Sequence, residues 1–179
     1  VTSKPVNRKM TDSGADEVKK GLLYASGLCA RSEQCVLDIR TKLLRRGLGA
    51  ADAGKIIAYL KANKFIDEQR FADSFVRMKL RQGNWGPRKI RQALLAKGIA
   101  DVMIRKAMEQ SDDDAHCANA YKAALRKAKG LNMAQAADRQ KVYRFLMSRG
   151  YQGETITRVM SRLGAEADDL FNEDDNCNS

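Results

Sequence analysis

One ten-residue pattern occurs three times in this sequence, as IRTKLLRRGL (39–48), IRQALLAKGI (90–99) and VYRFLMSRGY (142–151). Each copy has an aliphatic residue, two adjacent apolar residues four and five positions later, a glycine and one more apolar residue. The glycines are Gly47, Gly98 and Gly150, which are 51 and 52 residues apart. Apolar residues recur six, nine and ten positions after each glycine, which is helical spacing. The pattern therefore predicts a tandem repeat with a period of about fifty residues.

Residues near each repeat predict where its helices begin and end. Each glycine lies where a left-handed residue would end a helix, and the basic residues before it suit the negative end of the helix dipole. Ser32 and Asp67 are expected N-caps, and Pro87 is expected at the first position of a helix. No segment alternates with a period of two. The sequence predicts an all-α fold, a tandem array of three three-helix (helix-turn-helix-like) repeats that is elongated and curved.

The spacing also predicts the extent of each part. A flexible N-terminus (1–17) is expected before repeat 1 (18–65), repeat 2 (66–111) and repeat 3 (112–163), and an acidic flexible tail (164–179) after them. The predicted helices are 18–29, 33–46 and 51–63, then 67–81, 87–97 and 101–110, then 113–129, 136–149 and 153–163.

The net charge of +11 is unevenly spread along the 179 residues. Residues 24–110 sum to +10 and residues 111–163 to +5, whereas the tail 164–179 sums to −6. A basic body of this kind indicates a polyanionic partner, most simply nucleic acid. The alternative is that the lysines serve only solubility. A membrane surface is not favoured, because no basic amphipathic helix carries bulky aromatics on one face.

The cysteines do not indicate a metal site. Cys29, Cys35, Cys117 and Cys177 contain no C-x-x-C pair, and His116 is the only histidine. Buried thiols in a reducing cytosol are expected for Cys29 and Cys35. The N-terminal stretch lacks the apolar core of a signal peptide, and no apolar run is long enough to span a membrane. A cytoplasmic protein is expected.

The densest candidate site lies between residues 74 and 100, which hold seven basic residues and no acidic one. Helical projection places Arg70, Arg77 and Arg81 on one face and Phe71, Phe75 and Met78 on the neighbouring face, as core. The turn QGNWGP (82–87) presents Trp85, either to stack on a base or to lock the turn. The residues predicted to contact DNA or a filament are Arg70, Arg77, Lys79, Arg81, Trp85, Arg88, Lys89 and Arg91, with Arg45, Arg46, Arg144 and Arg149 in the other repeats.

No catalytic constellation appears in the sequence. The stretch GAADAGK (49–55) fits the start of a P-loop, but Ile56 stands where the Mg²⁺-binding hydroxyl belongs and no strand precedes it. The single histidine has no partnered nucleophile. No catalytic residue, cofactor or metal is therefore expected, and the protein is not expected to be an enzyme.

These segments resemble the RecX family of regulatory proteins. The resemblance rests on RSEQ (31–34) with IRTKLLRRG (39–47), on FIDEQRFADSFVRMKLRQGNWGPRKIRQALLAKGI (65–99) and on KVYRFLMSRGY (141–151). Trp85 stands where family members often have tyrosine, and the acidic tail matches no family feature. The resemblance implies a monomeric, non-enzymatic regulator in recombination, DNA repair and the SOS response. Such a protein binds the filament of the recombinase RecA, and weakly and non-specifically single- and double-stranded DNA, and inhibits ATP hydrolysis, filament growth and strand exchange.

An independent helical DNA-binding protein or transcriptional regulator is the alternative function, since three-helix units resemble helix-turn-helix modules. The third helices begin AADAGK, ADVMIR and GETITR, which are poor in side chains that read bases. The tandem arrangement also differs from the usual dimer on matched half-sites.

Overall fold

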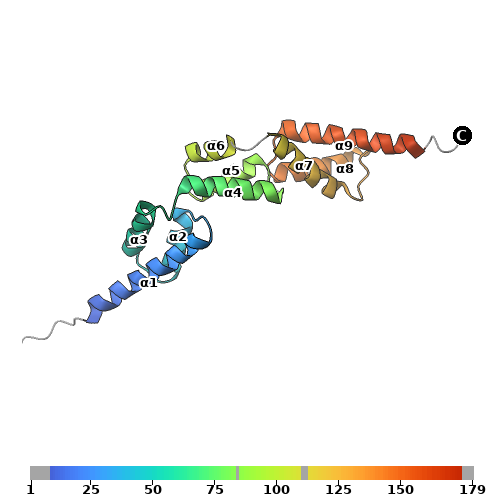
Figure 1. Ribbon diagram of the computed structural model, residues 1–179. Coiled ribbons are helices and arrows are strands. Elements are labelled where there is room, and N and C mark those ends of the chain that lie inside the picture. The colour runs from blue at the N-terminus through green and yellow to red at the C-terminus, as the bar shows by residue number, and fades with distance from the viewer. Residues whose placement is uncertain (1–8, 84, 110–112, 175–179) are drawn as a thin grey trace, which may run out of the picture. The chain divides into compact units, whose positions relative to one another are not determined.

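The backbone forms nine helices and no strand within the residues that the computed structural model describes, 9–83, 85–109 and 113–174 (Figure 1). The predicted all-α class is therefore confirmed. In chain order the helices are α1 (Lys9–Arg31), α2 (Val36–Arg45), α3 (Ala50–Ala62), α4 (Glu68–Gln82), α5 (Pro87–Ala96), α6 (Asp101–Glu109), α7 (Asp113–Ala128), α8 (Ala136–Ser148) and α9 (Gly153–Asp174). The division into three repeats at the boundaries given above stays a prediction, as does the curvature of the array.

The chain divides into two compact units. One contains the chain as far as Phe71 together with Lys97–Ile99, and the other contains Ala72–Ala96 and the chain from Ala100 onward. Helices α1, α2 and α3 pack together in the first unit, and α7, α8 and α9 pack together in the second (Figure 1). Both units have apolar cores, built around Ile39, Leu43 and Leu60 in the first and Val142, Leu146 and Ile156 in the second. Each such side chain contributes roughly 1.5–3 kcal/mol when it leaves water.

The adjacent apolar pair in each repeat points in two directions. The first members, Leu43, Leu94 and Leu146, are all 0% exposed. The second members are Leu44, Leu95 and Met147, with exposed fractions of 42%, 41% and 42%. Successive helical side chains are about 100° apart, so only the first member of each pair faces the core.

The three repeat glycines end their helices in the left-handed conformation that the sequence predicts, with φ of 89°, 76° and 84° at Gly47, Gly98 and Gly150. The end of α8 is a Schellman motif, since the Gly150 N–H donates to the Met147 carbonyl (2.9 Å) and the Tyr151 N–H donates to the Leu146 carbonyl (3.3 Å). The end of α2 has the same two hydrogen bonds at Gly47 and Leu48.

Two of the three predicted helix starts are confirmed. The Asp67 carboxylate accepts the Arg70 N–H at 2.9 Å, and α5 begins at Pro87. Ser32 as an N-cap is wrong. Helix α2 begins at Val36 after Cys35, because the Ser32 N–H still donates to Leu28 at the end of α1 and the Ser32 hydroxyl accepts the Gln34 side-chain amide (2.8 Å).

The terminal helices are longer than predicted. Helix α1 begins at Lys9 instead of residue 18, and α9 continues to Asp174 instead of ending at residue 163. Neither extension contains proline, and both include alanine and glutamate, which favour helix. Residues 1–8 and 175–179 lie outside the described residues, and the flexibility of both ends stays a prediction.

The three cysteines in the described part of the chain are free, and Cys177 lies outside it. Burial raises the pKa of the Cys35 and Cys29 thiols, which keeps them in their unreactive protonated form at neutral pH. None of the helices in the described ranges has the length and apolar character that a membrane span needs.

Candidate nucleic-acid interface

Trp85, in the turn between α4 and α5, is surrounded by an aromatic ring and two ammonium groups. The Phe75 ring lies edge-on to the indole, with centroids 6.3 Å apart. The Lys79 Nζ from α4 lies 4.3 Å from the indole centroid, and the Lys89 Nζ from α5 lies 5.1 Å from it. Such ammonium–ring contacts contribute about 0.5–1 kcal/mol each at exposed sites. Trp85 therefore gathers positive charge from two helices at one place.

Three further arginines of this stretch are exposed, namely Arg77 and Arg81 on α4 and Arg88 on α5. Within the described ranges no carboxylate forms an ion pair with any of them, nor with Lys79 or Lys89. Solvated arginines are common on outer helical faces. Five unneutralised cations around one turn nevertheless make this the most electropositive feature that the sequence predicted as a site.

Other basic candidates are engaged in ion pairs. The Arg91 guanidinium from α5 lies 2.7 Å from a carboxylate oxygen of Asp101 on α6. Lys97, within the first unit, lies 2.6 Å from Asp38. The exposed Arg91–Asp101 pair stabilises the fold by less than about 1 kcal/mol, whereas the Lys97–Asp38 pair is partly buried. They give both side chains a structural role, while a binding role for Arg91 stays a prediction.

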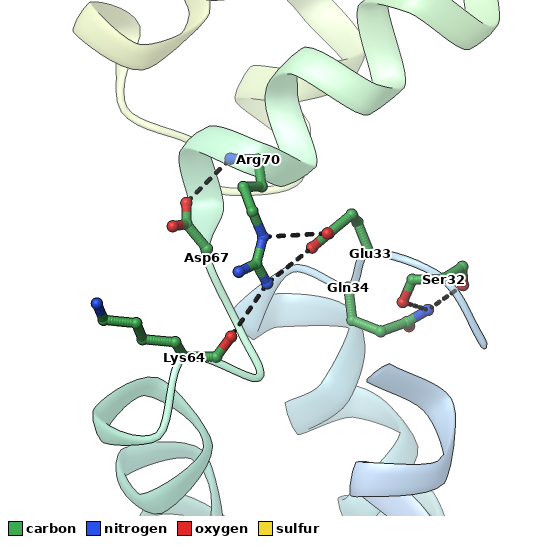
Figure 2. A network of polar contacts seen from close by, with 6 residues as sticks. All are labelled: Ser32, Glu33, Gln34, Lys64, Asp67 and Arg70. Atoms are coloured by element: carbon green, nitrogen blue, oxygen red, sulfur yellow. Dashed lines mark hydrogen bonds and ion pairs between the residues drawn. The ribbon is translucent and has the colours of Figure 1, made fainter. Parts of the chain in front are cut away.

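Arg70 lies in a polar network of the first unit (Figure 2). Its guanidinium donates to both carboxylate oxygens of Glu33, at 3.1 and 3.3 Å, and to the carbonyl of Lys64 at 3.1 Å. Lys64 has a φ of 57°, which is unfavourable for a residue with a side chain, so the Arg70 contact supports a strained turn. The bonds to Glu33 raise the pKa of Arg70. These contacts account for Arg70 without a ligand, and its predicted binding role remains a prediction.

The start of α5 meets the end of α8 through backbone hydrogen bonds in the second unit. The Gly86 N–H donates to the Arg149 carbonyl at 2.8 Å, and the Arg88 N–H donates to the Gly150 carbonyl at 3.1 Å. Free N–H groups at one helix start thus satisfy free carbonyls at another helix end. Because these donors are occupied, the α5 N-terminus is not an open backbone phosphate site. Anion binding here depends on side chains.

This junction requires two glycines. A Cβ built at Gly86 would lie 2.5 Å from the carbonyl carbon and oxygen of Gly150, and a Cβ built at Gly150 would lie 2.5 Å from the backbone nitrogen of Lys89. Side-chain contacts this short to backbone atoms cannot be relieved by rotating a side chain. The approach also places Arg149 beside the α5 start that carries Arg88.

Two side chains from the third repeat fix the α4–α5 turn. The Asn119 amide donates to the Leu80 carbonyl at 2.8 Å, and the Tyr151 hydroxyl lies 3.4 Å from the Gly83 carbonyl. Tyr151 is completely buried, and this burial raises its pKa to about 12, against the opposing effect of Arg126 and Arg149. The α4 side of the turn that carries Trp85 is therefore held by these two contacts.

The basic residues that precede the three repeat glycines share a different role. Arg46 lies 4.1 Å above the Tyr24 ring, Lys97 lies 5.8 Å from the Phe71 ring and Arg149 lies 5.0 Å from the Phe145 ring. The sequence predicted a helix-dipole role for these charges, and the structure adds an aromatic partner to each. Arg45 and Arg144 are exposed, and their binding roles stay predictions.

Sequence reasoning missed the junction and misplaced one core residue. Met78, predicted as core, is 38% exposed, although it follows the buried Phe71 by seven residues and so lies on nearly the same side of α4. The Gly86–Gly150 approach had only the W-G-P stretch (85–87) as a sequence signal. The P-loop-like stretch is helical from Ala50 onward, and no cluster of possible metal ligands occurs in the described residues.

Comparison with known proteins relates the chain to one family. Residues 67–108 match the family model for the second three-helix domain of RecX, and residues 113–160 match the model for its third. Regulatory protein RecX of Prosthecochloris aestuarii is 31% identical over 154 residues, which are 86% of this chain and 98% of that protein. The Chlorobium phaeobacteroides protein of the same name is 31% identical over 145 residues, covering 81% and 94%.

Two solved structures share the fold. The crystal structure of RecX from Lactobacillus salivarius is 21% identical and has a TM-score of 0.72, covering 84% of this chain and 99% of that one. A crystal structure of a regulatory protein RecX is 23% identical, with a TM-score of 0.75 and coverage of 90% and 82%.

Proposed function

The chain belongs to the RecX family of regulatory proteins, and from this premise we propose that it binds the filament of the recombinase RecA and inhibits its ATPase, growth and strand exchange. It acts as a cytoplasmic monomer in recombination, DNA repair and the SOS response. It is not an enzyme, and it requires no cofactor, because binding alone changes the state of the filament.

One observation carries the nucleic-acid part of this proposal. The α4–α5 turn presents exposed cations that no described carboxylate neutralises, represented by Arg81 and Arg88. Side chains of this kind contact phosphates without reading sequence, so DNA binding is weak, non-specific and sensitive to salt. The filament encloses a single DNA strand, which gives the basic turn its polyanion.

The proposal is tested on filament length. RecA is assembled on long single-stranded DNA with ATP, the protein is added at a small fraction of the RecA concentration, and filament lengths are measured by electron microscopy. Inhibited growth predicts shorter filaments at this low ratio. Unchanged filaments, together with tight sequence-selective binding to duplex DNA by the protein alone, would favour an independent DNA-binding regulator.

A further inference from the structure

We infer that Lys79 and Lys89, gathered by the indole of Trp85, form a clamp for a backbone phosphate of a nucleic-acid strand. This inference deepens the nucleic-acid contact of the proposed function and rests on it. It assigns the phosphodiester group as the ligand, the two lysines as its contacts and Trp85 as a positioning residue.

The geometry brings two ammonium groups from different helices to one aromatic ring. Because the Nζ atoms lie 4.3 and 5.1 Å from the same centroid, their separation cannot exceed the sum of these two distances. Lys79 also donates to Gln82 at 3.3 Å and lies 5.4 Å from the Phe75 centroid, which further restricts it. A restricted side chain loses less conformational entropy when it binds a ligand.

The turn beneath the clamp is itself fixed. The Gly86 N–H bond to Arg149 and the Asn119 amide bond to Leu80 hold the two ends of the turn against α7 and α8. The positions of α4 and α5 at the indole are therefore set by hydrogen bonds that do not involve the side chain of either lysine. Changing the lysines should leave these contacts in place.

The clamp has no counter-ion in the described part of the chain. Like charges gathered this closely repel one another and attract an anion. The paired lysine Lys97 differs in this respect, since Asp38 lies 2.6 Å from it. The sequence from 74 to 100 contains no acidic residue, so the surroundings of Lys79 and Lys89 favour a ligand that brings its own negative charge.

A phosphate fits this arrangement better than a stacked base. Both ammonium groups lie over the indole ring, so a base that stacked on a face occupied by an ammonium group would have to displace that group. Lysine binds phosphate as a point charge and needs no fixed orientation. Arg81 on α4 and Arg88 on α5 extend the positive charge beyond the two lysines. An extended positive surface matches the regularly spaced phosphates of a nucleic-acid strand better than a single carboxylate of a protein.

The first experiment separates phosphate from base. Trp85 is the only tryptophan in the chain, so its fluorescence reports on the clamp. The full-length protein is titrated with an oligothymidylate and with a strand of the same length in which every position is an abasic deoxyribose phosphate. Both strands should change the emission with midpoints within about twofold of each other, since each carries the same phosphates.

Variants then test the lysines. With a dye-labelled oligothymidylate, Lys79→Gln with Lys89→Gln should weaken binding by about tenfold or more, as expected when two charged contacts are lost. The matched control is Lys122→Gln with Lys129→Gln, which removes the same charge from one exposed lysine on α7 and one in the turn directly after it, and it should weaken binding by about twofold at most. Trp85→Leu should weaken binding because it removes the ring that positions the two lysines, although the Trp85 side chain does not touch the strand. Trp85→Phe keeps an aromatic ring and should retain part of the affinity.

Three results would overturn the inference. The first is a fluorescence change with the oligothymidylate and none with the abasic strand, which would mean that the Trp85 ring stacks on bases. The second is binding of polyglutamate of equal charge as tight as that of the abasic strand, which would mean that the surface binds an acidic protein. The third is an equal affinity of the Lys79/Lys89 double variant and its control for the strand, while both variants remain helical by circular dichroism. None of these assays contains recombinase, so the clamp can fail while filament inhibition by the wild-type chain stands.

Discussion

Gly86 lies directly against the carbonyl of Gly150, at a distance that leaves no room for a Cβ on either residue. The contact joins the start of α5 to the end of α8, where the Gly86 N–H donates to Arg149 and the Arg88 N–H donates to Gly150. Residues 64 positions apart in the chain thereby hold the basic turn in one geometry. Integrity of the second unit and presentation of the candidate interface depend on the same backbone contact.

Replacing Gly150 with alanine tests this contact. The substitution combines a left-handed conformation at φ 84° with a Cβ 2.5 Å from the Lys89 backbone. Backbone strain of about 1–2 kcal/mol and overpacking of about 1–3 kcal/mol predict that the free energy of unfolding falls by roughly 2–5 kcal/mol. Urea denaturation followed by circular dichroism measures the change.

Gly98→Ala is the matched control, because Gly98 has a φ of 76° but a Cβ there would meet no atom within 4 Å. Gly98→Ala introduces the same backbone strain but no steric clash, so it should lower the free energy of unfolding by only about 1–2 kcal/mol. If Gly150→Ala proved no more destabilising than Gly98→Ala, the close approach of α5 and the α8 end would not contribute to stability.

The contrast between these two glycines also shows what sequence can predict. A glycine followed by an apolar residue after a helical pattern predicts a left-handed helix end, and Gly47, Gly98 and Gly150 all have one. Such local patterns extend over a few residues, so they also gave the start of α5 at Pro87. The packing of Gly150 on Lys89 depends on how two distant segments meet, which no local pattern records.

The same distinction limits what the sequence predicts about the site. Charge density located the α4–α5 turn, but it did not separate Arg91, paired with Asp101, from Arg88, which has no such partner in the described residues. Ser32 has the composition of an N-cap, yet its N–H completes the end of α1. Competition between neighbouring helices for one residue is settled by tertiary packing.

The raised pKa of Tyr151 predicts that the protein loses stability at high pH. Its ordinary pKa of 10 rises to about 12 on folding because the ring is buried. Between these values the unfolded chain releases the proton while the folded chain keeps it, so the free energy of unfolding falls as pH rises. The contribution is fully present below pH 10, is lost by pH 12, and amounts to roughly 3 kcal/mol.

Tyr151→Phe isolates this contribution from the titration of other groups. The variant keeps the ring and should differ from the wild-type chain by less than about 1 kcal/mol at pH 7, since only the weak hydroxyl contact to Gly83 is lost. Its stability should fall less steeply between pH 10 and 12. Parallel curves for the two proteins in urea denaturation would contradict a buried, protonated Tyr151.

The Asp67 cap predicts a second stability change. Asp67→Ala removes the acceptor of the Arg70 N–H and should lower the free energy of unfolding by about 1 kcal/mol. Asp52→Ala is the control. Asp52 lies in the first turn of α3 but forms only an exposed ion pair with Lys55, which stabilises the fold by about 0.3–0.5 kcal/mol. Equal losses in thermal denaturation would mean that the cap has no specific role.

Charge reversal on α5 should separate binding from stability. Arg88→Glu removes an exposed charge with no carboxylate partner in the described residues, so it should weaken binding to single-stranded DNA and reduce the salt slope by about 1, with little change in stability. Arg91→Glu breaks the pair with Asp101 and should lower stability by about 1 kcal/mol. Fluorescence anisotropy across a salt series and thermal melts check both. Unchanged binding by Arg88→Glu would move the interface elsewhere.

ATP hydrolysis by RecA on single-stranded DNA shows whether the chain inhibits the filament through its basic turn. The wild-type chain is added at a small fraction of the RecA concentration, beside Arg81→Glu with Arg88→Glu and beside Lys122→Glu with Lys129→Glu. Inhibition of the filament through the basic turn predicts that the wild-type chain and the Lys122/Lys129 variant lower the hydrolysis rate, and that the Arg81/Arg88 variant lowers it far less. A rate that stays unchanged with the wild-type chain would contradict the account.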